Sequence, residues 1–228
     1  MTESPPKLPG HLRRNDALFL FGSLRPKPWV LAYEQPYVEI VGGPSCKPEK
    51  EILLDNTDRD GIAVRQRRGG GGTVVLSPGM VITVVVGRRK RDDAIRDIFG
   101  RVHEGIIRVC AELKLPAPRH RGLSDLAVGE KKLLGSSLYL SQKPFLYYYQ
   151  SSLMVDPDKS LFDRYLKHPP REPDYRKGRS HALFCTSLRQ EGHSIRAAAL
   201  ASVLQRRLPE LIGDAEGSQV REAEAKGS

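Results

Sequence analysis

The apolar positions of the chain follow strand spacing in several short runs and helix spacing in a few longer ones. Runs of β-branched and other apolar residues bounded by glycine or proline predict strands at 17–21, 37–41, 73–76, 81–86, 126–128, 132–137 and 145–155. Apolar residues three and four positions apart predict a long helix over about residues 92–114. Shorter helices are predicted over 47–55 and 160–167, and a last one begins at Ser194. The chain therefore combines strands and helices.

The same pattern divides the chain into three parts. Residues 1–15 are rich in Pro, Lys and Arg, lack periodicity and are predicted to be a mobile arm. Residues 16–212 are predicted to form the folded domain, since 228 residues suffice for one large domain or at most two small ones. Residues 213–228 are rich in Glu, Ala, Gly and Ser and are predicted to be disordered. His168–Arg179 is Pro-rich and charged, and we expect it to be a mobile substrate cover.

Cysteine usage and hydropathy indicate a cytoplasmic protein. The three cysteines, Cys46, Cys110 and Cys185, are odd in number and widely spaced, which argues against a disulfide framework and a zinc site. No apolar run approaches the roughly 18 residues that span a bilayer. The N-terminus lacks the pattern of a secretory signal. We therefore expect a reducing compartment and no membrane association.

The net charge of +10 calls for an anionic ligand or partner. Nucleic acid is the first class to consider for a basic chain. However, the aromatic residues do not interleave with the basic ones as they do on a base-stacking surface. Phosphate-bearing substrates and an acidic protein partner are the alternatives, because a basic surface steers both. Charge alone does not choose among these classes.

A glycine-rich stretch between two predicted strands is the main candidate for chemistry. Three arginines, Arg65, Arg67 and Arg68, precede the four glycines 69–72, and strand-forming residues begin at Thr73. Backbone N–H groups without side chains can cradle an anion, and guanidinium groups are forked donors for carboxylate or phosphate. The stretch is neither a P-loop nor a dinucleotide fingerprint, because no helix follows it. An anion-binding loop and a flexible basic hairpin loop are both consistent with these residues.

Two cysteines and two histidines are interpreted as residues without a chemical role. Cys46 lies near a predicted helix start, where an activated thiolate is an alternative, but we interpret it as a small packed residue. Cys110 is predicted to lie in the core. His103 and His120 are interpreted as surface or boundary residues, because no second metal ligand lies at helical or hairpin spacing from either.

Three motifs in order resemble those of lipoate–protein ligases. Arg67-Arg68 with the glycines 69–72 and Thr73-Val74 is similar to the arginine-plus-glycine motif of that family. Ser124-Asp125-Leu126 followed by 129–136 (GEKKLLGS) looks like the second motif, and 152–156 (SLMVD) resembles the strand after it. The resemblance extends from about residue 17 to 208. It implies an α/β fold of the α+β type, with a mixed β-sheet flanked by helices as in biotin/lipoate-ligase catalytic domains.

The resemblance also implies a reaction. In that family, lipoate or octanoate and ATP with Mg²⁺ form an acyl-adenylate such as lipoyl-AMP, and the acyl group passes to a lysine of an acceptor. The implied acceptor is an acidic lipoyl domain or a glycine-cleavage-H-like protein. By position, Lys132 matches the lysine that contacts acyl carbonyl and phosphate, and Asp125 matches the Mg²⁺ carboxylate. The implied binding residues are Arg67, Arg68, Gly69, Gly70, Gly71, Gly72, Thr73, Gly79, Gly135, Ser136 and Gln150.

The chain departs from the family pattern at two positions and in length. Leu76 and Gln150 stand where many members have histidine, which would alter acyl-chain preference or slow transfer. The separate accessory C-terminal domain of some ligases is expected to be absent. Either a separate accessory subunit completes the reaction or the remaining helices suffice.

Two other functions remain open at this point. One is an ATP-independent octanoyl- or lipoyl-transferase of the same superfamily, with Cys46 or Cys185 as nucleophile, which Ser77-Pro78-Gly79 faintly supports. The other is a non-catalytic basic module that binds a ligand or nucleic acid, although we expect no nucleic-acid partner. A biotin ligase is disfavoured because the Gly-Arg-Gly-Arg signature is missing.

Overall fold

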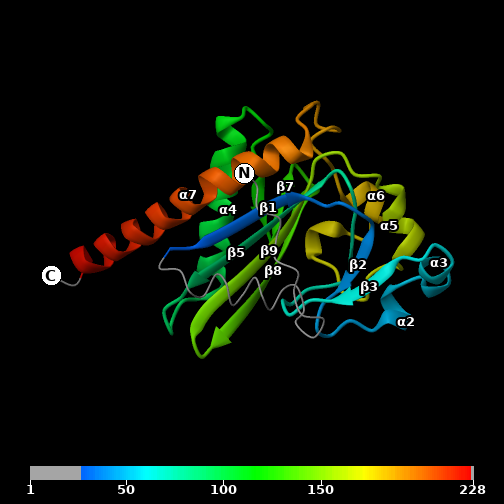
Figure 1. Ribbon diagram of the computed structural model, residues 1–228, viewed down its shortest axis with the longest axis horizontal. Helices are drawn as coiled ribbons and strands as arrows, with labels where there is room; N and C mark the ends of the chain where they lie inside the picture. Colours follow the sequence, from blue (N-terminus) through cyan, green and yellow to red (C-terminus); the bar gives the residue numbers. More distant parts are fainter. Residues whose placement is uncertain (1–26, 227–228) are drawn as a thin grey trace, which may run out of the picture.

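The computed structural model describes residues 27–226, so the predicted strand at 17–21 and the arm at 1–15 lie outside the described residues (Figure 1). Its main sheet has six strands in the order β1-β5-β9-β8-β7-β6, each antiparallel to its neighbours. The strands are β1 (Trp29–Glu34), β5 (Met80–Arg88), β6 (Arg119–Arg121), β7 (Asp125–Val128), β8 (Lys131–Gln142) and β9 (Phe145–Met154). The predicted strands at 81–86, 126–128, 132–137 and 145–155 are confirmed.

A second, smaller sheet carries the glycine-rich stretch. Its strands are β2 (Glu39–Gly42), β3 (Ala63–Gln66) and β4 (Val74–Leu76). β2 is parallel to β3 and antiparallel to β4, so this sheet is mixed. The glycines 69–72 join β3 to β4. The predicted combination of mixed sheet and flanking helices is confirmed.

Two long helices, α4 (Ile95–Glu112) and α7 (Ala197–Lys226), cover one face of the main sheet (Figure 1). The apolar positions of α4 point inward as predicted and are fully buried, namely Ile98, Val102, Ile106 and Val109. They pack with Leu200, Leu204 and Leu208 of α7 in the largest core. Burial of each such side chain contributes about 1.5–3 kcal/mol, so this face is the main source of stability.

The short helices surround the small sheet on the other side of the molecule (Figure 1). They are α2 (Pro48–Glu51), α3 (Leu54–Arg59), α5 (Ser160–Tyr165), α6 (His181–Phe184) and the 3₁₀ helix η1 (Asp174–Arg176). A second core joins them to the small sheet, with Ile40, Ile52 and Val75 packed against Phe162 and Phe184. No described helix is both long and apolar enough to cross a bilayer.

Several elements differ from the prediction; β6, η1 and α6, for example, were not predicted. The single helix predicted over 47–55 is two helices, because Ile52 between them is buried and forms a β-bridge with Leu166. β1 was not predicted, although Val30 and Ala32 alternate inward along it. The last helix begins at Ala197, three residues after the predicted start at Ser194, and its backbone continues to Lys226.

Candidate functional site

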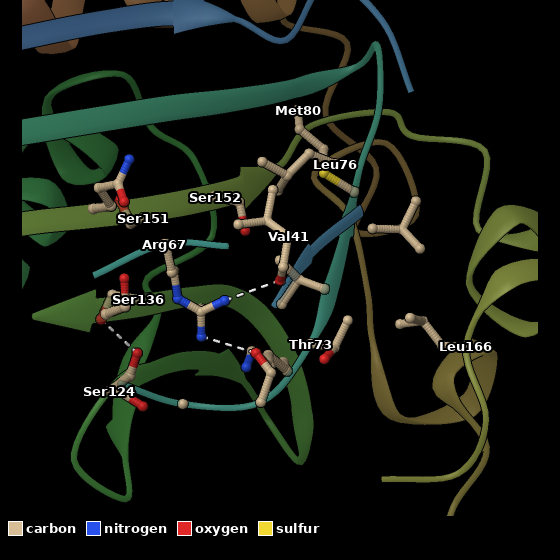
Figure 2. A pocket seen from close by; sticks show the side chains of 18 of the residues that line it. Val41, Arg67, Thr73, Leu76, Met80, Ser124, Ser136, Ser151, Ser152 and Leu166 are labelled. Carbon is tan, nitrogen blue, oxygen red and sulfur yellow. Dashed lines mark hydrogen bonds between the residues drawn. The ribbon is translucent and has the colours of Figure 1, made fainter. Parts of the chain in front are cut away.

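A cavity of about 610 Å³ lies where the small sheet meets the main sheet (Figure 2). Its wall includes residues of β2, β3, the glycine-rich stretch, β4, β5, β7, β8, β9, α5, α6 and the segment 168–179. Leu76, Met80 and Leu166 lie on one side of the Arg67 guanidinium, and Ser124 and Ser136 lie on the other (Figure 2). The cavity therefore has an apolar side and a polar side.

An ion pair between two predicted residues lies on the polar side of the cavity. Lys132 Nζ is 2.8 Å from Asp125 Oδ1, and the two side chains are 24% and 8% exposed. Asp125 opens β7 and Lys132 lies near the start of β8. The register between these strands shifts between Leu126 and Ala127, and a shift of this kind re-aims the side chains beside it. The hairpin thus brings the lysine and the carboxylate together inside the cavity.

Gly135 leaves the space in which the Lys132 side chain lies. A Cβ at this position would be 2.7 Å from both Cε and Nζ of Lys132, which is too close for a real contact. Glycine here therefore lets the lysine lie flat across β8 toward Asp125.

We predict that Gly135→Ala displaces the Lys132 amine and lowers the rate of the reaction at this site about 10-fold while the fold stays intact. The lysine end is flexible, so it moves instead of unfolding the strand. Initial rates and thermal unfolding measure the two effects. Gly100→Ala on α4 is the matched control, because a Cβ there meets no atom within 4 Å. A Gly135→Ala protein with a normal rate would contradict this role.

Tyr175, which was not predicted as a site residue, contacts the same carboxylate. Its hydroxyl donates to Asp125 Oδ2 over 2.8 Å, and its ring packs on Phe184 at 5.0 Å between centroids. Burial and the negative charge of Asp125 raise the pKa of Tyr175, so it is a neutral donor. A lone aromatic residue in a polar, proline-rich segment was the only sequence signal for it.

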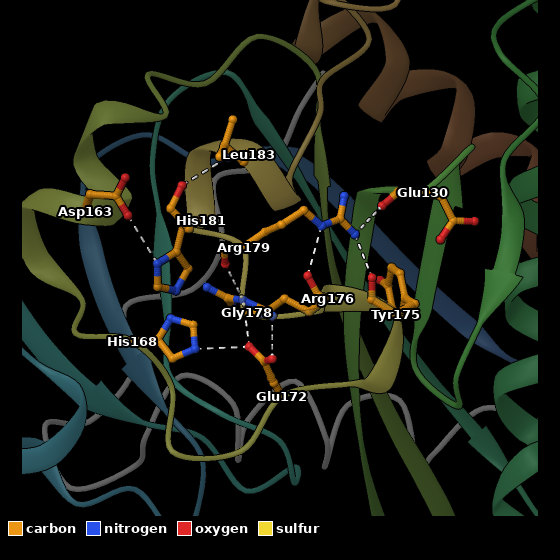
Figure 3. A network of polar contacts seen from close by, with 11 residues as sticks. Glu130, Asp163, His168, Glu172, Tyr175, Arg176, Gly178, Arg179, His181 and Leu183 are labelled. Atoms are coloured by element: carbon orange, nitrogen blue, oxygen red, sulfur yellow. Dashed lines mark hydrogen bonds and ion pairs between the residues drawn. The ribbon is translucent and has the colours of Figure 1, made fainter.

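Tyr175 belongs to the segment 168–179, whose own polar contacts are extensive (Figure 3). Arg176 is 4% exposed and its Nε lies 3.3 Å from Glu172 Oε2. Arg179 Nη2 donates to the carbonyl oxygens of Tyr175 and Glu130, so the segment is tied to the turn between β7 and β8. This Pro-rich, charged segment lines the cavity. One of its charged side chains, Arg176, is nevertheless buried.

Arg67 organises the glycine-rich stretch from inside. Its Nη1 donates to Val41 O at 3.0 Å, and its Nη2 donates to Gly70 O at 3.0 Å and Gly72 O at 2.8 Å. Burial lowers the pKa of Arg67 to about 10, so it remains a cation at neutral pH. Within the described residues, no hydrogen bond uses the backbone N–H groups of glycines 70–72. The guanidinium thus holds the carbonyls, and the N–H groups remain available to a ligand.

The structure brings most of the predicted binding residues to the cavity wall. Those that line it are Arg67, Arg68, Gly71, Gly72, Thr73, Asp125, Lys132, Gly135, Ser136 and Gln150. Gly69, Gly70 and Gly79 are not among the lining residues. Gly79 has φ +82°, and a Cβ there would be 2.3 Å from the Asp156 carbonyl oxygen. Its conformation therefore serves the turn before β5.

Two of these residues, Arg68 and Thr73, make contacts of their own. Arg68 is exposed and its Cζ lies 5.5 Å from the centre of the Tyr139 ring. Thr73 Oγ1 donates to Glu51 Oε2 over 2.6 Å and lies 3.0 Å from Cys46 Sγ. Thr73 therefore ties the end of the glycine-rich stretch to α2. Leu76, like Gln150, lines the cavity, so both departures from the family pattern face the site.

The three cysteines have different surroundings. Cys185 lines the cavity and forms a parallel β-bridge with Lys132. Burial raises the pKa of the Cys185 thiol. Cys46 is partly buried and packs against the second core, with its Sγ beside Thr73 Oγ1. Cys110 is buried in the main core as predicted, and burial raises its pKa to about 11.

The prediction of His103 as a surface or boundary residue was wrong. His103 is fully buried, because it lies on the buried side of α4. Its Nδ1 lies 3.3 Å from His120 Nδ1, and its Nε2 lies 3.1 Å from Ser136 Oγ. Burial, followed by the neighbouring His120, lowers the pKa of His103 to about 3, so the ring is neutral. Among residues 27–226, no three His, Cys, Asp or Glu side chains gather as a metal site.

Comparison with solved structures shows the same fold in lipoate ligases. A bipartite lipoate protein ligase from the archaeon Thermoplasma acidophilum, described with its E2 lipoyl domain, is 20% identical, with a TM-score of 0.71 over 89% of this chain and 82% of that chain. A lipoate-protein ligase A bound with ATP is 20% identical, with a TM-score of 0.71 over 91% and 85%. P. falciparum LipL1 in complex with lipoate is 17% identical, with a TM-score of 0.66 over 82% of this chain.

The chain covers 50% of P. falciparum LipL1, so it spans half the length of that relative. A search of curated proteins found no match. A family model for the lipoyl protein ligase A/B catalytic domain matches residues 16–208, which is most of the chain. With the cavity, the Lys132–Asp125 pair and the glycine-rich stretch, this match shows that the chain belongs to the family of lipoyl protein ligase A/B catalytic domains.

Proposed function

We propose that the protein is an ATP-dependent lipoate–protein ligase. In the first step a carboxylate oxygen of lipoate, or of octanoate, attacks the α-phosphorus of ATP and pyrophosphate leaves. In the second step the amine of an acceptor lysine attacks the acyl carbonyl, a C–N bond forms, and AMP leaves with the bonding electrons. The observation that carries the proposal is the Lys132–Asp125 pair in a cavity walled by the glycine-rich stretch.

The polar side of the cavity suits both steps. The first step gathers negative charge on phosphate oxygens, and the second gathers it on the carbonyl oxygen. The Lys132 ammonium and the N–H groups of Gly71 and Gly72, which line the cavity, are donors for such charge. The buried Nε of Arg67 also has no hydrogen-bond partner in the described part of the chain, which leaves a further donor for a bound phosphate or carboxylate.

Asp125 would be the protein ligand of Mg²⁺. A single carboxylate next to substrate phosphates is the usual protein contribution to a magnesium site, and Asp125 is 8% exposed in the wall of the cavity. The ion would neutralise phosphate charge in the first step. Asp125 and Lys132 would then have separate tasks. Asp125 would hold the ion, and Lys132 would donate to the reacting phosphate and carbonyl oxygens.

The apolar side of the cavity suits an acyl chain. Leu76, Met80, Met154, Phe162 and Phe184 line it, and its volume falls within the range of small-molecule pockets, roughly 300–1,000 Å³. A medium-length acyl tail would replace water against these side chains. Because Leu76 stands where many family members have histidine, this wall is more apolar than the family pattern.

The acceptor would be an acidic protein. The net charge of +10 favours encounter with an acidic lipoyl domain or a glycine-cleavage-H-like protein. The Thermoplasma ligase, described with its E2 lipoyl domain, supports the first of these. That ligase is bipartite, so a separate accessory subunit for this chain is part of the proposal.

The test is lipoate-dependent release of pyrophosphate from ATP and Mg²⁺ without an acceptor, with mass spectrometry of the small-molecule product. We expect lipoyl-AMP to form in an amount close to that of the enzyme. Absence of the adenylate both alone and with an added accessory subunit would contradict the proposal.

The alternative is an ATP-independent acyltransferase with Cys185 as nucleophile. Cys185 lies in the cavity wall beside Lys132, as a nucleophile would need to. Against this function, burial raises the pKa of the thiol and so disfavours the reactive thiolate.

We predict that Cys185→Ser keeps the ligase rate within about threefold, because the ligase reaction forms no thioester. Cys46→Ser is the control, since Cys46 does not line the cavity. Acyl transfer from an acyl-carrier thioester, measured without ATP, completes the comparison. Loss of all acyl transfer in Cys185→Ser alone would favour the transferase.

A further inference from the structure

His103 makes polar contacts that the proposed chemistry does not use. It lies on α4, beside the rings of Phe99 and Tyr149 at centroid distances of 5.7 and 5.8 Å. A polar ring in such an apolar place is costly unless its nitrogens are hydrogen-bonded. Both nitrogens have partners, His120 on one side and Ser136 on the other. This arrangement links α4 to the strand that carries Lys132.

The proton positions follow from the one contact whose donor is certain. The Ser136 hydroxyl donates to Ser124 O over 2.7 Å, because a carbonyl oxygen only accepts. The Ser136 oxygen then accepts from Nε2–H of His103. Because the His103 ring is neutral, its Nδ1 has no proton and accepts from Nδ1–H of His120. Nε2 of His120 lies 3.2 Å from Glu104 Oε1.

The chain of hydrogen bonds ends beside both members of the ion pair. Ser124 O accepts a second bond from the backbone N–H of Ser136 at 2.9 Å, so both of its lone pairs are used (Figure 2 shows the side-chain bond). Ser124 directly precedes Asp125, and Gly135, on which Lys132 lies, directly precedes Ser136. The two serines therefore fix the peptides next to Asp125 and under Lys132.

We propose that His103 is a positioning residue of the site: through Ser136 it fixes the Ser124 carbonyl and thereby the geometry in which Asp125 and Lys132 meet. His120 lies at the exposed end of this chain of hydrogen bonds and keeps His103 in the Nε2–H tautomer. The positioning effect on catalysis rests on the proposed function. The tautomer and the hydrogen bonds are properties of the free protein.

The first experiment is ¹⁵N NMR of the histidine rings in the full-length free protein. We expect His103 to be protonated at Nε2 only and to remain so between about pH 5.5 and 8. In Ser136→Ala, the Nε2–H resonance should shift because its acceptor is gone. A His103 ring that is protonated at Nδ1, or that titrates in this range, would overturn the proposal.

The second experiment separates positioning from stability by kinetics of adenylate formation. His103→Leu keeps the volume and removes both contacts, whereas His103→Gln has one donor for Ser136 and one acceptor for His120. We expect kcat to fall about 10-fold in the leucine variant with KM for lipoate within twofold, and to recover to within about threefold in the glutamine variant. Val102→Ala is the control for a disturbed core, since Val102 is fully buried on α4 and has no polar side-chain atom.

The results distinguish this inference from the proposed function. If His103→Leu and Val102→Ala lower kcat equally, or if glutamine restores nothing, His103 has only a structural role and the inference falls. If the wild-type protein forms no adenylate, the proposed function falls instead. The NMR spectra then still decide whether the hydrogen-bond chain from His120 to Ser124 exists.

Discussion

Replacement of Lys132 by alanine is expected to lower the rate of acyl-adenylate formation by about 10²–10³-fold, the usual effect of removing one donor to developing charge. The reason is that Lys132 Nζ is the cation nearest Asp125 in the cavity wall, 2.8 Å from Oδ1. Truncation removes a positive charge from the place where phosphate charge accumulates. Single-turnover kinetics with lipoate and ATP measure the loss of rate. The circular dichroism spectrum of the variant shows whether it is folded.

Lys131→Ala is the matched control for this prediction. Lys131 is the exposed neighbour of Lys132 on the same strand, and its removal lowers the net charge by the same amount. We expect Lys131→Ala to keep the rate within about twofold, because an exposed charge is screened by water and salt. Equal losses in the two variants would mean that overall charge, and not the paired lysine, controls the reaction.

Replacement of Arg67 by alanine is expected to have the largest effect on stability among the site residues. The guanidinium makes three hydrogen bonds to carbonyl oxygens, to Val41, Gly70 and Gly72, and is 8% exposed. Their loss leaves carbonyls without partners near the site and removes the support of the glycine-rich stretch. We expect about 3–5 kcal/mol lower unfolding free energy, hence a fall in Tm of roughly 6–20 °C.

Arg68→Ala serves as the control for Arg67→Ala. Arg68 is exposed and contacts the Tyr139 ring, so its truncation should change the unfolding free energy by less than about 1 kcal/mol. Denaturant unfolding of both variants gives the comparison. Hydrogen exchange should also show faster exchange over residues 67–73 in Arg67→Ala alone. A stable Arg67→Ala protein with a protected glycine-rich stretch would contradict this account.

The fold could be predicted where the periodicity was strong and local. The buried face of α4 and the β-branched run of β5 were evident, because one side of each element packs in a core. β1 was missed because Trp29–Glu34 is short and follows a proline-rich stretch of sequence. The break at Ile52 depends on its pairing with Leu166, which is more than a hundred residues away in the sequence. Such long-range pairing leaves no local pattern.

The site could be predicted where motifs fix the spacing. Lys132 and Asp125 lie on one hairpin, so their proximity follows from a short stretch of sequence. The bonds of Arg67 to loop carbonyls did not follow from its motif, because backbone acceptors have no sequence signature. Tyr175 and His103 were missed since they reach the site from distant segments.

The most direct test of the central claim is intact-mass spectrometry of an acidic lipoyl domain after incubation with the protein, lipoate, ATP and Mg²⁺, with and without an added accessory subunit. We expect a mass gain of one lipoyl group on the acceptor that requires ATP and disappears with Lys132→Ala. A mass gain without ATP, or an undiminished gain with Lys132→Ala, would contradict it.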